Sequence, residues 1–167
     1  MDELIEKMKP IEAWTREMES QTGRIPRSKI LGKITDLGLT PESVHNSYHK
    51  TVFVFKDVVV KFCNALEISR EKTLMKMSRG LYVDVMYIGT NMIVQRRGEP
   101  IAKWTSGALS VRIAGTTRGL TDLHLDNIMK FGEEYRIIDG KTTRRRPASA
   151  TVQEKVETEA QLTPAER

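Results

Sequence analysis

The sequence predicts an α+β fold in which helices precede and accompany an antiparallel sheet. Between residues 43 and 62 the apolar residues change from helical spacing to strand alternation, and three short strand patterns follow one another. Consecutive short strands joined by tight turns favour an antiparallel arrangement. A further apolar pair of strand patterns follows a helical segment. The expected strands are Ser43 to Ser47, Thr51 to Phe55, Val58 to Phe62, Tyr82 to Gly89 and Asn91 to Gln95.

The N-terminal region is expected to form a helical brace on this sheet. Apolar residues recur at helical spacing along residues 2–20, and Pro10 inside this stripe predicts either a kink or two short helices. Residues 21–27 are expected to be a linker, with Ser28 as the N-cap of a second helix that ends near Gly38. A helix-turn-helix is the alternative interpretation, because two helices, a Gly-containing turn and basic residues occur together.

The strand pattern V-V-V-K-F at residues 58–62 combines expected burial with a charge. Its first three residues are apolar enough for a strand that is covered on both faces, yet Lys61 follows them directly. A buried ammonium group needs a partner or a ligand. Residues 65–78 have a helical composition, and Glu67 and Glu71 share a helix face that can turn toward the sheet. These carboxylates are therefore candidate partners of Lys61.

Composition limits the classes of protein to consider. With 167 residues, of which 39% are hydrophobic and 29% charged, the chain is long enough to bury one core. The single cysteine, Cys63, excludes an internal disulfide, as suits a reducing cytosol. No apolar run approaches the roughly 20 residues that span a bilayer, and the acidic start does not resemble a signal peptide. We therefore expect a soluble, cytoplasmic protein without a membrane partner.

The net charge of +5 favours partners that carry phosphate. Much of the excess lies in the run Arg144 to Arg146 and in scattered lysines, without the interleaved aromatic residues of a base-stacking surface. A basic run is usually a solvated surface. We therefore do not expect nucleic acid to be the main partner.

The stretch from Thr121 to Gly140 combines a hairpin pattern with polar residues at its ends. Two short strand patterns, residues 128–131 and 135–138, flank a Gly-Glu-Glu turn. Because a hairpin brings its ends together, we expect the flanking Asp122, Asn127 and Asp139 to lie at one mouth. Such a set can hold a divalent cation and orient a hydroxyl group. The alternative is structural, since Asp and Asn are also common in turns and at strand ends.

The spacing of these residues resembles the catalytic loop and the metal-binding Asp-x-Gly of the protein kinase-like superfamily. The spelling D-L-H-x-x-N, with His124 where most protein kinases have lysine, is similar to the aminoglycoside-phosphotransferase branch and to short kinase-like proteins of tailed phages. The V-V-V-K-F strand and the helix after it resemble the phosphate-binding strand and helix of the same fold. The resemblance covers roughly residues 43–143.

The resemblance implies ATP and Mg²⁺ as cofactors and a five-stranded antiparallel sheet. Lys61 would bind the α- and β-phosphates, and Glu71 would orient Lys61. Glu71 is the first choice for this role because apolar residues that suit a packed helix follow it in the sequence, and Glu67 is the reserve choice.

The same resemblance assigns the transfer chemistry to the hairpin region. Asp122 would accept the proton of the acceptor hydroxyl, and His124 would lie close to the transferred phosphate. Asn127 and Asp139 would hold Mg²⁺. Leu120 occupies a position where many kinases have a structural histidine.

Two further stretches are expected to contact the nucleotide. The loop H-N-S-Y-H-K between the first two strands has no glycine, although kinases usually cover the phosphates with a Gly-rich turn. Its expected contributors are Ser47, His49 and Lys50. Gln95 to Pro100 would form the hinge that holds adenine, chiefly through backbone groups, and the hinge includes Arg96. Val94 would lie beside the adenine, with an ordinary core valine as the alternative.

These assignments divide the chain into four expected parts. They are a helical brace (1–42), an N-lobe of five antiparallel strands and one helix (43–95), a strongly truncated C-lobe (96–143) and a flexible polar tail (144–167). Residues 101–118 would form the helix that presents the catalytic loop. Too little chain follows Gly140 for the peptide-binding helices of larger kinases. We expect a minimal kinase-like unit, or one that a second copy completes, with Val152 to Leu162 as the candidate helix of the tail.

We therefore expect an ATP- and Mg²⁺-dependent Ser/Thr protein kinase of phage type, acting in the host cytoplasm on a host protein or on itself. Thr142, Thr143 and Ser149 are candidate autophosphorylation sites. His124 also fits a small-molecule phosphotransferase, but that class usually carries a large C-terminal substrate lobe. Two more classes fit parts of the sequence, namely a pseudokinase that binds nucleotide and modulates a host protein, and a DNA-binding regulator.

Overall fold

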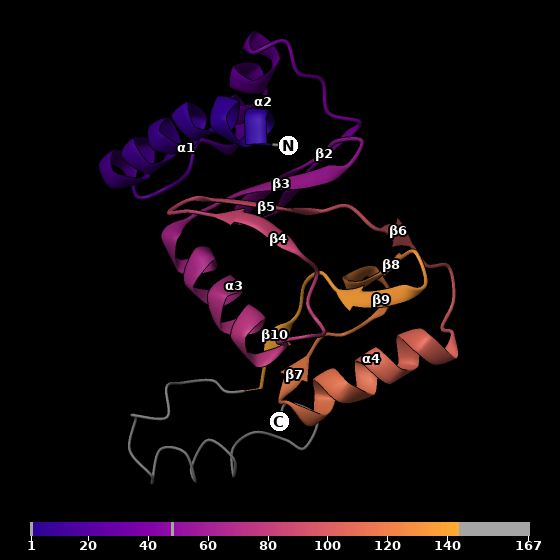
Figure 1. Cartoon of the computed structure of the whole chain (residues 1–167). Coiled ribbons are helices and arrows are strands. Elements are labelled where there is room, and N and C mark those ends of the chain that lie inside the picture. The colour runs from indigo at the N-terminus through magenta and orange to yellow at the C-terminus, as the bar shows by residue number, and fades with distance from the viewer. Residues whose placement is uncertain (1, 48, 144–167) are drawn as a thin grey trace, which may run out of the picture. The chain divides into compact units, whose positions relative to one another are not determined.

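The computed structural model describes residues 2–47 and 49–143, and it divides into two compact units. The first unit comprises Met1–Lys72 and Val83–Gly98, and the second comprises Thr73–Tyr82 and Glu99–Arg167. The boundary falls inside helix α3 (Ala65–Met77). Figure 1 follows the chain through its elements. The predicted tail helix lies outside the described residues.

The first unit is built on a five-stranded antiparallel sheet with the order β1-β2-β3-β5-β4. The strands are β1 (Ser43–Ser47), β2 (Lys50–Val54), β3 (Val58–Cys63), β4 (Val85–Ile88) and β5 (Met92–Arg96). The predicted α+β class and five-stranded antiparallel sheet are confirmed. β4 begins later than predicted, because Tyr82 instead forms an isolated parallel bridge with Ile137 in the second unit.

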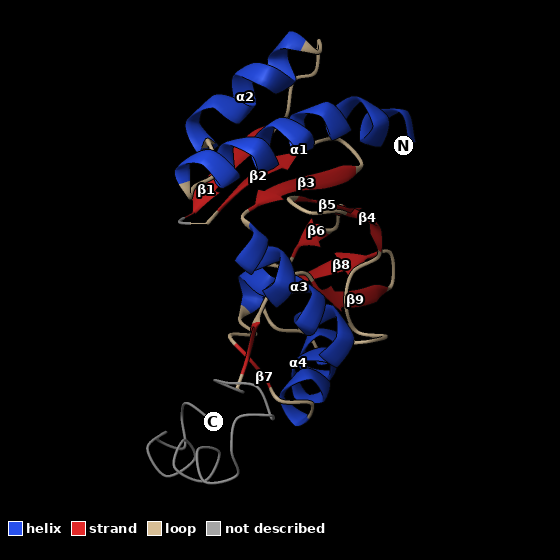
Figure 2. Cartoon of the chain, turned by 90° about the vertical axis from the view of Figure 1, so that its left-hand side faces the viewer, coloured by secondary structure: helices blue, strands red, loops and turns tan. Residues whose placement is uncertain are grey.

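Helices α1 (Asp2–Thr22) and α2 (Arg27–Asp36) lie on the same side of this sheet (Figure 2). They share one core with it, whose buried members are Ile5, Met8, Ile11, Ile30, Ile34, Phe53, Val58, Val60, Phe62, Met92 and Val94. Burial of this apolar surface is the main stabilising contribution to the unit. α1 runs through Pro10 as one helix, so the predicted alternative of two short helices is wrong.

A buried carboxylate on α1 also attaches this helix to the sheet. Glu12 accepts hydrogen bonds from the Tyr87 hydroxyl at 2.5 Å and from the Asn91 backbone N–H at 2.9 Å. These bonds compensate Glu12 for the loss of water. Burial, and then the hydrogen bond to Glu12, raise the pKa of Tyr87 to about 12. The brace therefore has polar as well as apolar contacts with the sheet.

The start of α2 differs from the prediction that Ser28 is its N-cap. The N-cap is Pro26, and no side chain of a described residue caps the helix. Proline suits a helix start because its fixed φ matches helical geometry and it has no N–H to leave unbonded. At the other end the helix closes before Gly38, whose φ of 80° is the left-handed conformation that commonly follows a helix.

In the part of the second unit that the structure describes, helix α4 accompanies two small sheets and a short 3₁₀ helix. Its elements are β6 (Glu99–Pro100), α4 (Ser106–Thr117), β7 (Leu120–Thr121), η1 (Leu125–Asn127), β8 (Ile128–Phe131), β9 (Glu134–Ile137) and β10 (Lys141–Thr142). β6, β8 and β9 form one antiparallel sheet, and β7 pairs with β10. The hairpin turn places Gly132 at a φ of 64°, which glycine adopts readily. α4 starts later than the predicted residue 101, because Thr105 caps it by accepting a bond from the Ala108 N–H at 3.2 Å.

Candidate active site

Lys61 lies on the sheet face opposite the core under α1 and α2. Side chains alternate between the two faces along a strand, and directly paired residues share a face. Val60 and Phe62, the neighbours of Lys61, belong to that core, whereas Lys61 itself pairs with Val52 and Ile93. The alternation therefore directs the ammonium group away from the brace.

A buried ion pair joins β3 to α3. The Lys61 Nζ lies 3.5 Å from the Glu71 Oε1, and the two side chains are 6% and 2% exposed. Glu67 forms its ion pair with Arg70 instead, at 2.9 Å. The structure thus selects Glu71, the first choice from the sequence, rather than Glu67 as the partner of Lys61. In a low-dielectric interior such a pair holds both charged groups in a defined geometry.

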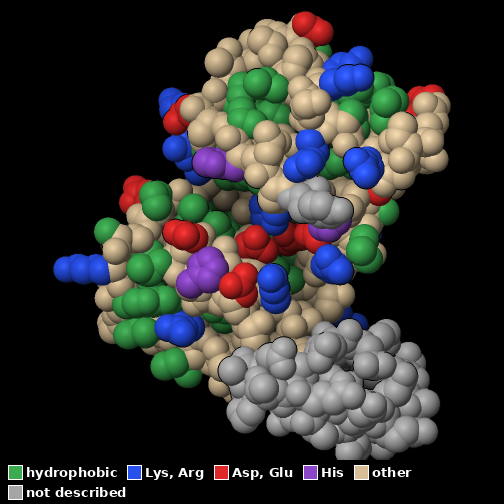
Figure 3. Space-filling view, turned by 180° about the vertical axis from the view of Figure 1, so that it is seen from behind, with side chains coloured by type: hydrophobic (Ala, Val, Ile, Leu, Met, Phe, Trp, Pro, Cys, Tyr) green, Lys and Arg blue, Asp and Glu red, His purple; other side chains and the backbone are tan. Residues whose placement is uncertain are grey.

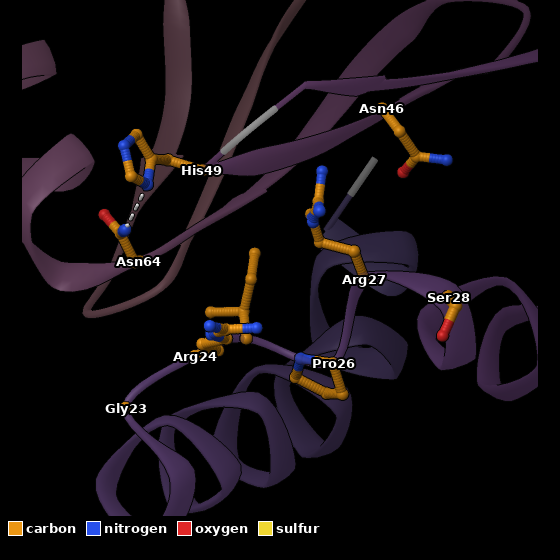
Figure 4. A pocket seen from close by; sticks show the side chains of 9 residues that line it. Gly23, Arg24, Pro26, Arg27, Ser28, Asn46, His49 and Asn64 are labelled. Atoms are coloured by element: carbon orange, nitrogen blue, oxygen red, sulfur yellow. Dashed lines mark hydrogen bonds between the residues drawn. The ribbon is translucent and has the colours of Figure 1, made fainter.

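Two of the three residues expected to contact phosphate share the sheet face of Lys61. By register, Ser47 and Lys50 pair with each other and fall on that face. His49 lies in the turn between β1 and β2, where its Nδ1 is 3.0 Å from the amide nitrogen of Asn64 (Figure 4). This turn has a hydroxyl group and a second ammonium group on the face of Lys61, but no glycine in its sequence.

Val94 does not share the face of Lys61, contrary to its predicted place beside the adenine. It is fully buried in the core under α1 and α2, together with Val60, with which it pairs across β3 and β5. Its alternative interpretation as a core valine is therefore the one that fits. The sequence left both interpretations open, because the face of a β5 residue depends on the pairing register.

The next residue, Gln95, lies on the same sheet face as Lys61. Gln95 pairs with Val59, two positions before Lys61 on β3. Its side chain is buried, and its Oε1 has no hydrogen-bond partner among the described residues. A buried acceptor of this kind commonly marks contact with water or a ligand. Arg96, also assigned to nucleotide binding, is exposed, and its Nη1 lies 3.7 Å from Asp84.

In the second unit, Asp122 begins the catalytic-loop pattern with a strained backbone. Its φ is 61°, a left-handed value that residues other than glycine rarely adopt. The Asp122 carbonyl oxygen accepts a bond from the Asn127 amide at 2.7 Å, and its Oδ1 lies 3.0 Å from the His124 Nε2. The carboxylate and the imidazole side chains are 39% and 56% exposed. Asp122 is therefore held in an unusual conformation and remains accessible.

The β8–β9 hairpin brings Asn127 and Asp139 to its mouth. The Ile138 N–H donates to the Asn127 carbonyl at 2.9 Å, and Asp139 follows directly. The Asp139 Oδ1 accepts a bond from the Gly140 N–H at 2.7 Å. Because the amide nitrogen of Asn127 binds Asp122, the amide oxygen of Asn127 is the atom that can serve a ligand. Hydrogen bonds thus join Asp122 to Asn127, and Asn127 to Ile138, the residue before Asp139.

Two glycines allow other elements to approach this loop closely. A Cβ at Gly115 of α4 would lie 2.6 Å from the Leu123 Cδ1. A Cβ at Gly140 would lie 3.3 Å from the Thr121 carbonyl oxygen. The absence of a side chain at these positions lets α4 and the segment before β10 pack against the residues around Asp122.

Asn127 and Asp139 suit a magnesium ion that is delivered with a nucleotide. Among the described residues, no group of three or more His, Cys, Asp and Glu side chains could hold a metal ion. Asn127 and Asp139 offer one amide oxygen and carboxylate oxygens, which are hard ligands. Mg²⁺ usually takes one or two carboxylates and obtains its other ligands from water and substrate phosphates. The donor set therefore fits a Mg²⁺ ion that takes most of its ligands from elsewhere better than a dedicated metal cage.

Asp122 and His124 are accessible to solvent, whereas Asn127 is buried. Figure 3 shows one face of the molecule, on which acidic side chains lie close to a histidine.

Two apolar side chains on the face of Lys61, Val59 and Ile93, were not identified as site residues from the sequence. Val59 could have been found from alternation alone, because it precedes Lys61 by two residues on the same strand. Ile93 required the pairing register of β3 and β5, which no local pattern specifies. The left-handed backbone of Asp122 likewise has no signal in the sequence beyond the tolerance of Asp for this conformation.

No family model, curated protein or solved structure matches this chain. None of the helices in the described part of the chain is long and apolar enough to cross a membrane. The function must therefore be inferred from the side chains themselves.

Proposed function

We propose that this chain is an ATP- and Mg²⁺-dependent phosphotransferase, a protein kinase that phosphorylates serine or threonine hydroxyl groups. The observation that supports this most strongly is the buried pair of Lys61 and Glu71. An apolar pair of similar volume would avoid the desolvation of two charges. In phosphoryl transfer, by contrast, an ammonium group held by a carboxylate neutralises the charge of nucleotide phosphates.

The sheet face of Lys61 is the proposed nucleotide-binding surface of the first unit. Lys61 would bind the α- and β-phosphates, and Glu71 would keep its ammonium group in position. Lys50 and Ser47 on the same face would add a second cation and a hydroxyl donor. The unpaired Oε1 of Gln95 would accept an N–H from the amino group of adenine.

The loop of the second unit is proposed to act on the acceptor hydroxyl. Asp122 would accept the hydroxyl proton, with His124 orienting its carboxylate through the 3.0 Å contact. Asn127 and Asp139 would hold Mg²⁺, which when bound neutralises charge on the phosphate oxygens. Positioning and charge neutralisation supply most of the catalysis in phosphoryl transfer. The residues present therefore cover the main chemical requirements.

The proposed acceptor is a protein, either a host protein or a second copy of this chain. Two of the candidate autophosphorylation sites, Thr142 and Thr143, are half-buried. Thr142 pairs with Leu120 across β7 and β10, and the Thr143 N–H donates to the Gly119 carbonyl at 2.8 Å. These threonines would have to leave that pairing to reach an active site. Ser149 lies outside the described residues.

A nucleotide-binding protein without transfer activity is the second candidate function. It is favoured by the absence of glycine from residues 45–50 of the sequence. Kinases use the flexible backbone of a Gly-rich turn to cover the phosphates. A turn in which every residue has a side chain would bind the phosphates less closely. The protein would then act by changing its conformation when nucleotide binds, rather than by transferring a phosphate group.

Thermal unfolding with and without Mg²⁺ and ATP tests nucleotide binding. The comparison uses the unmodified protein, Asp139→Asn, and Asp126→Asn as a matched control from the exposed part of the same loop. A ligand at 100 times its Kd stabilises by about 2.7 kcal/mol, which raises Tm by several degrees. We expect this rise in the unmodified protein and in the control, and a much smaller one in Asp139→Asn.

The outcomes separate the candidates. A rise in Tm accompanied by transfer of the γ-phosphate supports the kinase, and a rise without transfer supports the nucleotide-binding protein. No effect of nucleotide contradicts both. Salt-sensitive binding of duplex DNA without an effect of nucleotide would support the DNA-binding regulator instead.

A further inference from the structure

A cavity of about 600 Å³ lies in the first unit, where the α1–α2 connection meets the β1–β2 hairpin. Its polar lining consists of Arg24, Arg27, Ser28, Asn46, His49 and Asn64 (Figure 4). The volume is within the usual range of small-molecule sites. Neither Lys61 nor Glu71 lines it, so its chemistry must be explained separately from the proposed nucleotide site.

The charge of this lining is positive. Arg24 and Arg27 contribute two guanidinium groups, and no Asp or Glu occurs among the described residues that line the cavity. Arg27 is fixed in place because its Nη1 donates to the Ser47 carbonyl. A guanidinium group has five N–H donors, so this bond leaves others for a ligand.

The amide side chains of the cavity are oriented as donors. The Asn46 Oδ1 accepts a bond from the Thr51 hydroxyl at 2.7 Å, and the Asn64 Oδ1 accepts one from the Glu67 N–H at 2.8 Å. Both amide oxygens are therefore engaged within the protein. The Asn64 nitrogen lies 3.0 Å from the His49 Nδ1, which must then accept, so the hydrogen of the neutral ring is on Nε2.

The start of α2 adds to this excess of donors. Arg27 and Ser28 form its first turn; the Arg27 N–H donates to the Ile25 carbonyl at 2.9 Å, and the preceding Pro26 has no side chain that could accept a bond from that turn. The partial positive charge of a helix N-terminus favours an anion there. The helix end, the two arginines and the amide groups of Asn46 and Asn64 thus all suit the same kind of ligand.

We propose that this cavity binds a phosphomonoester, a compact dianion whose oxygens accept hydrogen bonds. Such a group complements cations and donors and requires no acceptor from the protein. A free small phosphate compound and a phosphorylated side chain of a protein share this chemistry. The site is distinct from the proposed ATP site and does not depend on phosphotransferase activity.

An NMR titration of ¹⁵N-labelled full-length protein tests the proposal. The probes are inorganic phosphate and a phosphoserine-containing pentapeptide, each added at constant ionic strength. We expect saturable shifts of the backbone amides of Arg27, Ser28 and Asn46. Arg24→Gln is expected to weaken binding by about tenfold, since it removes one charge-assisted contact. Arg70→Gln, which removes an exposed arginine outside the cavity, should leave the Kd unchanged.

Arg27→Lys is a second variant, because it keeps the charge but loses the planar fork; it should weaken phosphate binding while the fold is retained. Shifts that do not saturate, or equal weakening by Arg24→Gln and Arg70→Gln, would show general attraction to positive charge and overturn the proposal. Tighter binding of inorganic phosphate identifies a small-molecule site, and tighter binding of the peptide identifies a phosphoprotein site. Asp139→Asn should bind both probes normally, which separates this site from the proposed ATP site.

Discussion

The ammonium nitrogen of Lys61 lies 3.5 Å from a carboxylate oxygen of Glu71, and both side chains are almost completely buried. Each charge compensates the other for the loss of water, so removing either one leaves the other buried without this ion pair. The pair therefore has consequences for stability that can be measured without any assay of activity.

Breaking this pair from either side should destabilise the protein. Lys61→Met and Glu71→Leu are each expected to lower the free energy of unfolding by about 3–5 kcal/mol, because the remaining charge stays buried. The double variant should recover part of that loss, since neither charge of the pair remains buried. Urea denaturation of the four proteins provides the comparison. Losses that simply add in the double variant would show that the two charges do not interact.

Gly115 should tolerate a side chain less well than Gly32 does. A Cβ there would lie 2.6 Å from the Leu123 Cδ1, so Gly115→Ala is expected to cost about 1–3 kcal/mol through overpacking. The matched control is Gly32→Ala in α2, where a Cβ would meet nothing within 4 Å. That change should stabilise by about 0.5–1 kcal/mol, because alanine favours helix. Thermal unfolding of both variants tests the contrast, and equal effects would contradict the close packing of α4 on the loop.

Because the backbone of Asp122 is left-handed, glycine should be tolerated better than alanine at this position. Asp122→Gly and Asp122→Ala both remove the contact with His124, but only glycine relieves the strain at a φ of 61°. We therefore expect Asp122→Gly to be more stable than Asp122→Ala by about 1 kcal/mol. Both variants should lack transfer activity. Equal stability of the two variants in denaturant would mean that the strain is absent.

The contact between Tyr87 and Glu12 predicts a loss of stability at alkaline pH. The Tyr87 hydroxyl has a pKa raised from its ordinary value of 10.0 to about 12, chiefly by burial. Between these values the folded state binds more protons than the unfolded state, so the contribution of Tyr87 to stability falls as pH rises. It should be complete below about pH 10 and absent above about pH 12.

The variant Tyr87→Phe isolates this effect, because phenylalanine cannot ionise. The difference in unfolding free energy between the unmodified protein and Tyr87→Phe should shrink as the pH rises from about 9 to about 12. Urea denaturation at several pH values measures that difference. A difference that stays constant across this range would argue against the raised pKa.

Local patterns in the sequence were sufficient to predict the elements that carry the site. The apolar strand interrupted by Lys61 and the helix with Glu71 are both short-range patterns, and so is the β8–β9 hairpin with its glycine turn. The burial of Lys61 and Glu71 could also be predicted, because an apolar strand and an apolar helix face pack together. These features depend on residues close in the sequence.

The errors concern features that depend on residues far apart in the sequence or on the exact backbone geometry. Val94 was placed beside the adenine with a core valine as the alternative, and the register of β5 on β3 puts it in the core. Ser28 was assigned as an N-cap, but the N-cap is Pro26, where the fixed φ of proline determines the start. The φ of Asp122 is supported by the bond from Asn127, which forms only when the loop is folded.

Transfer of a labelled phosphate group tests the proposed role of Asp122 most directly. The unmodified protein, Asp122→Asn and the control Asp126→Asn are incubated with Mg²⁺, γ-labelled ATP and a protein mixture that supplies acceptor hydroxyl groups. We predict labelled protein with the unmodified chain and with Asp126→Asn, and a rate at least about 100-fold lower with Asp122→Asn, since a general base typically contributes that much. Equal labelling by Asp122→Asn, or no labelling by the unmodified chain, would contradict the proposed role.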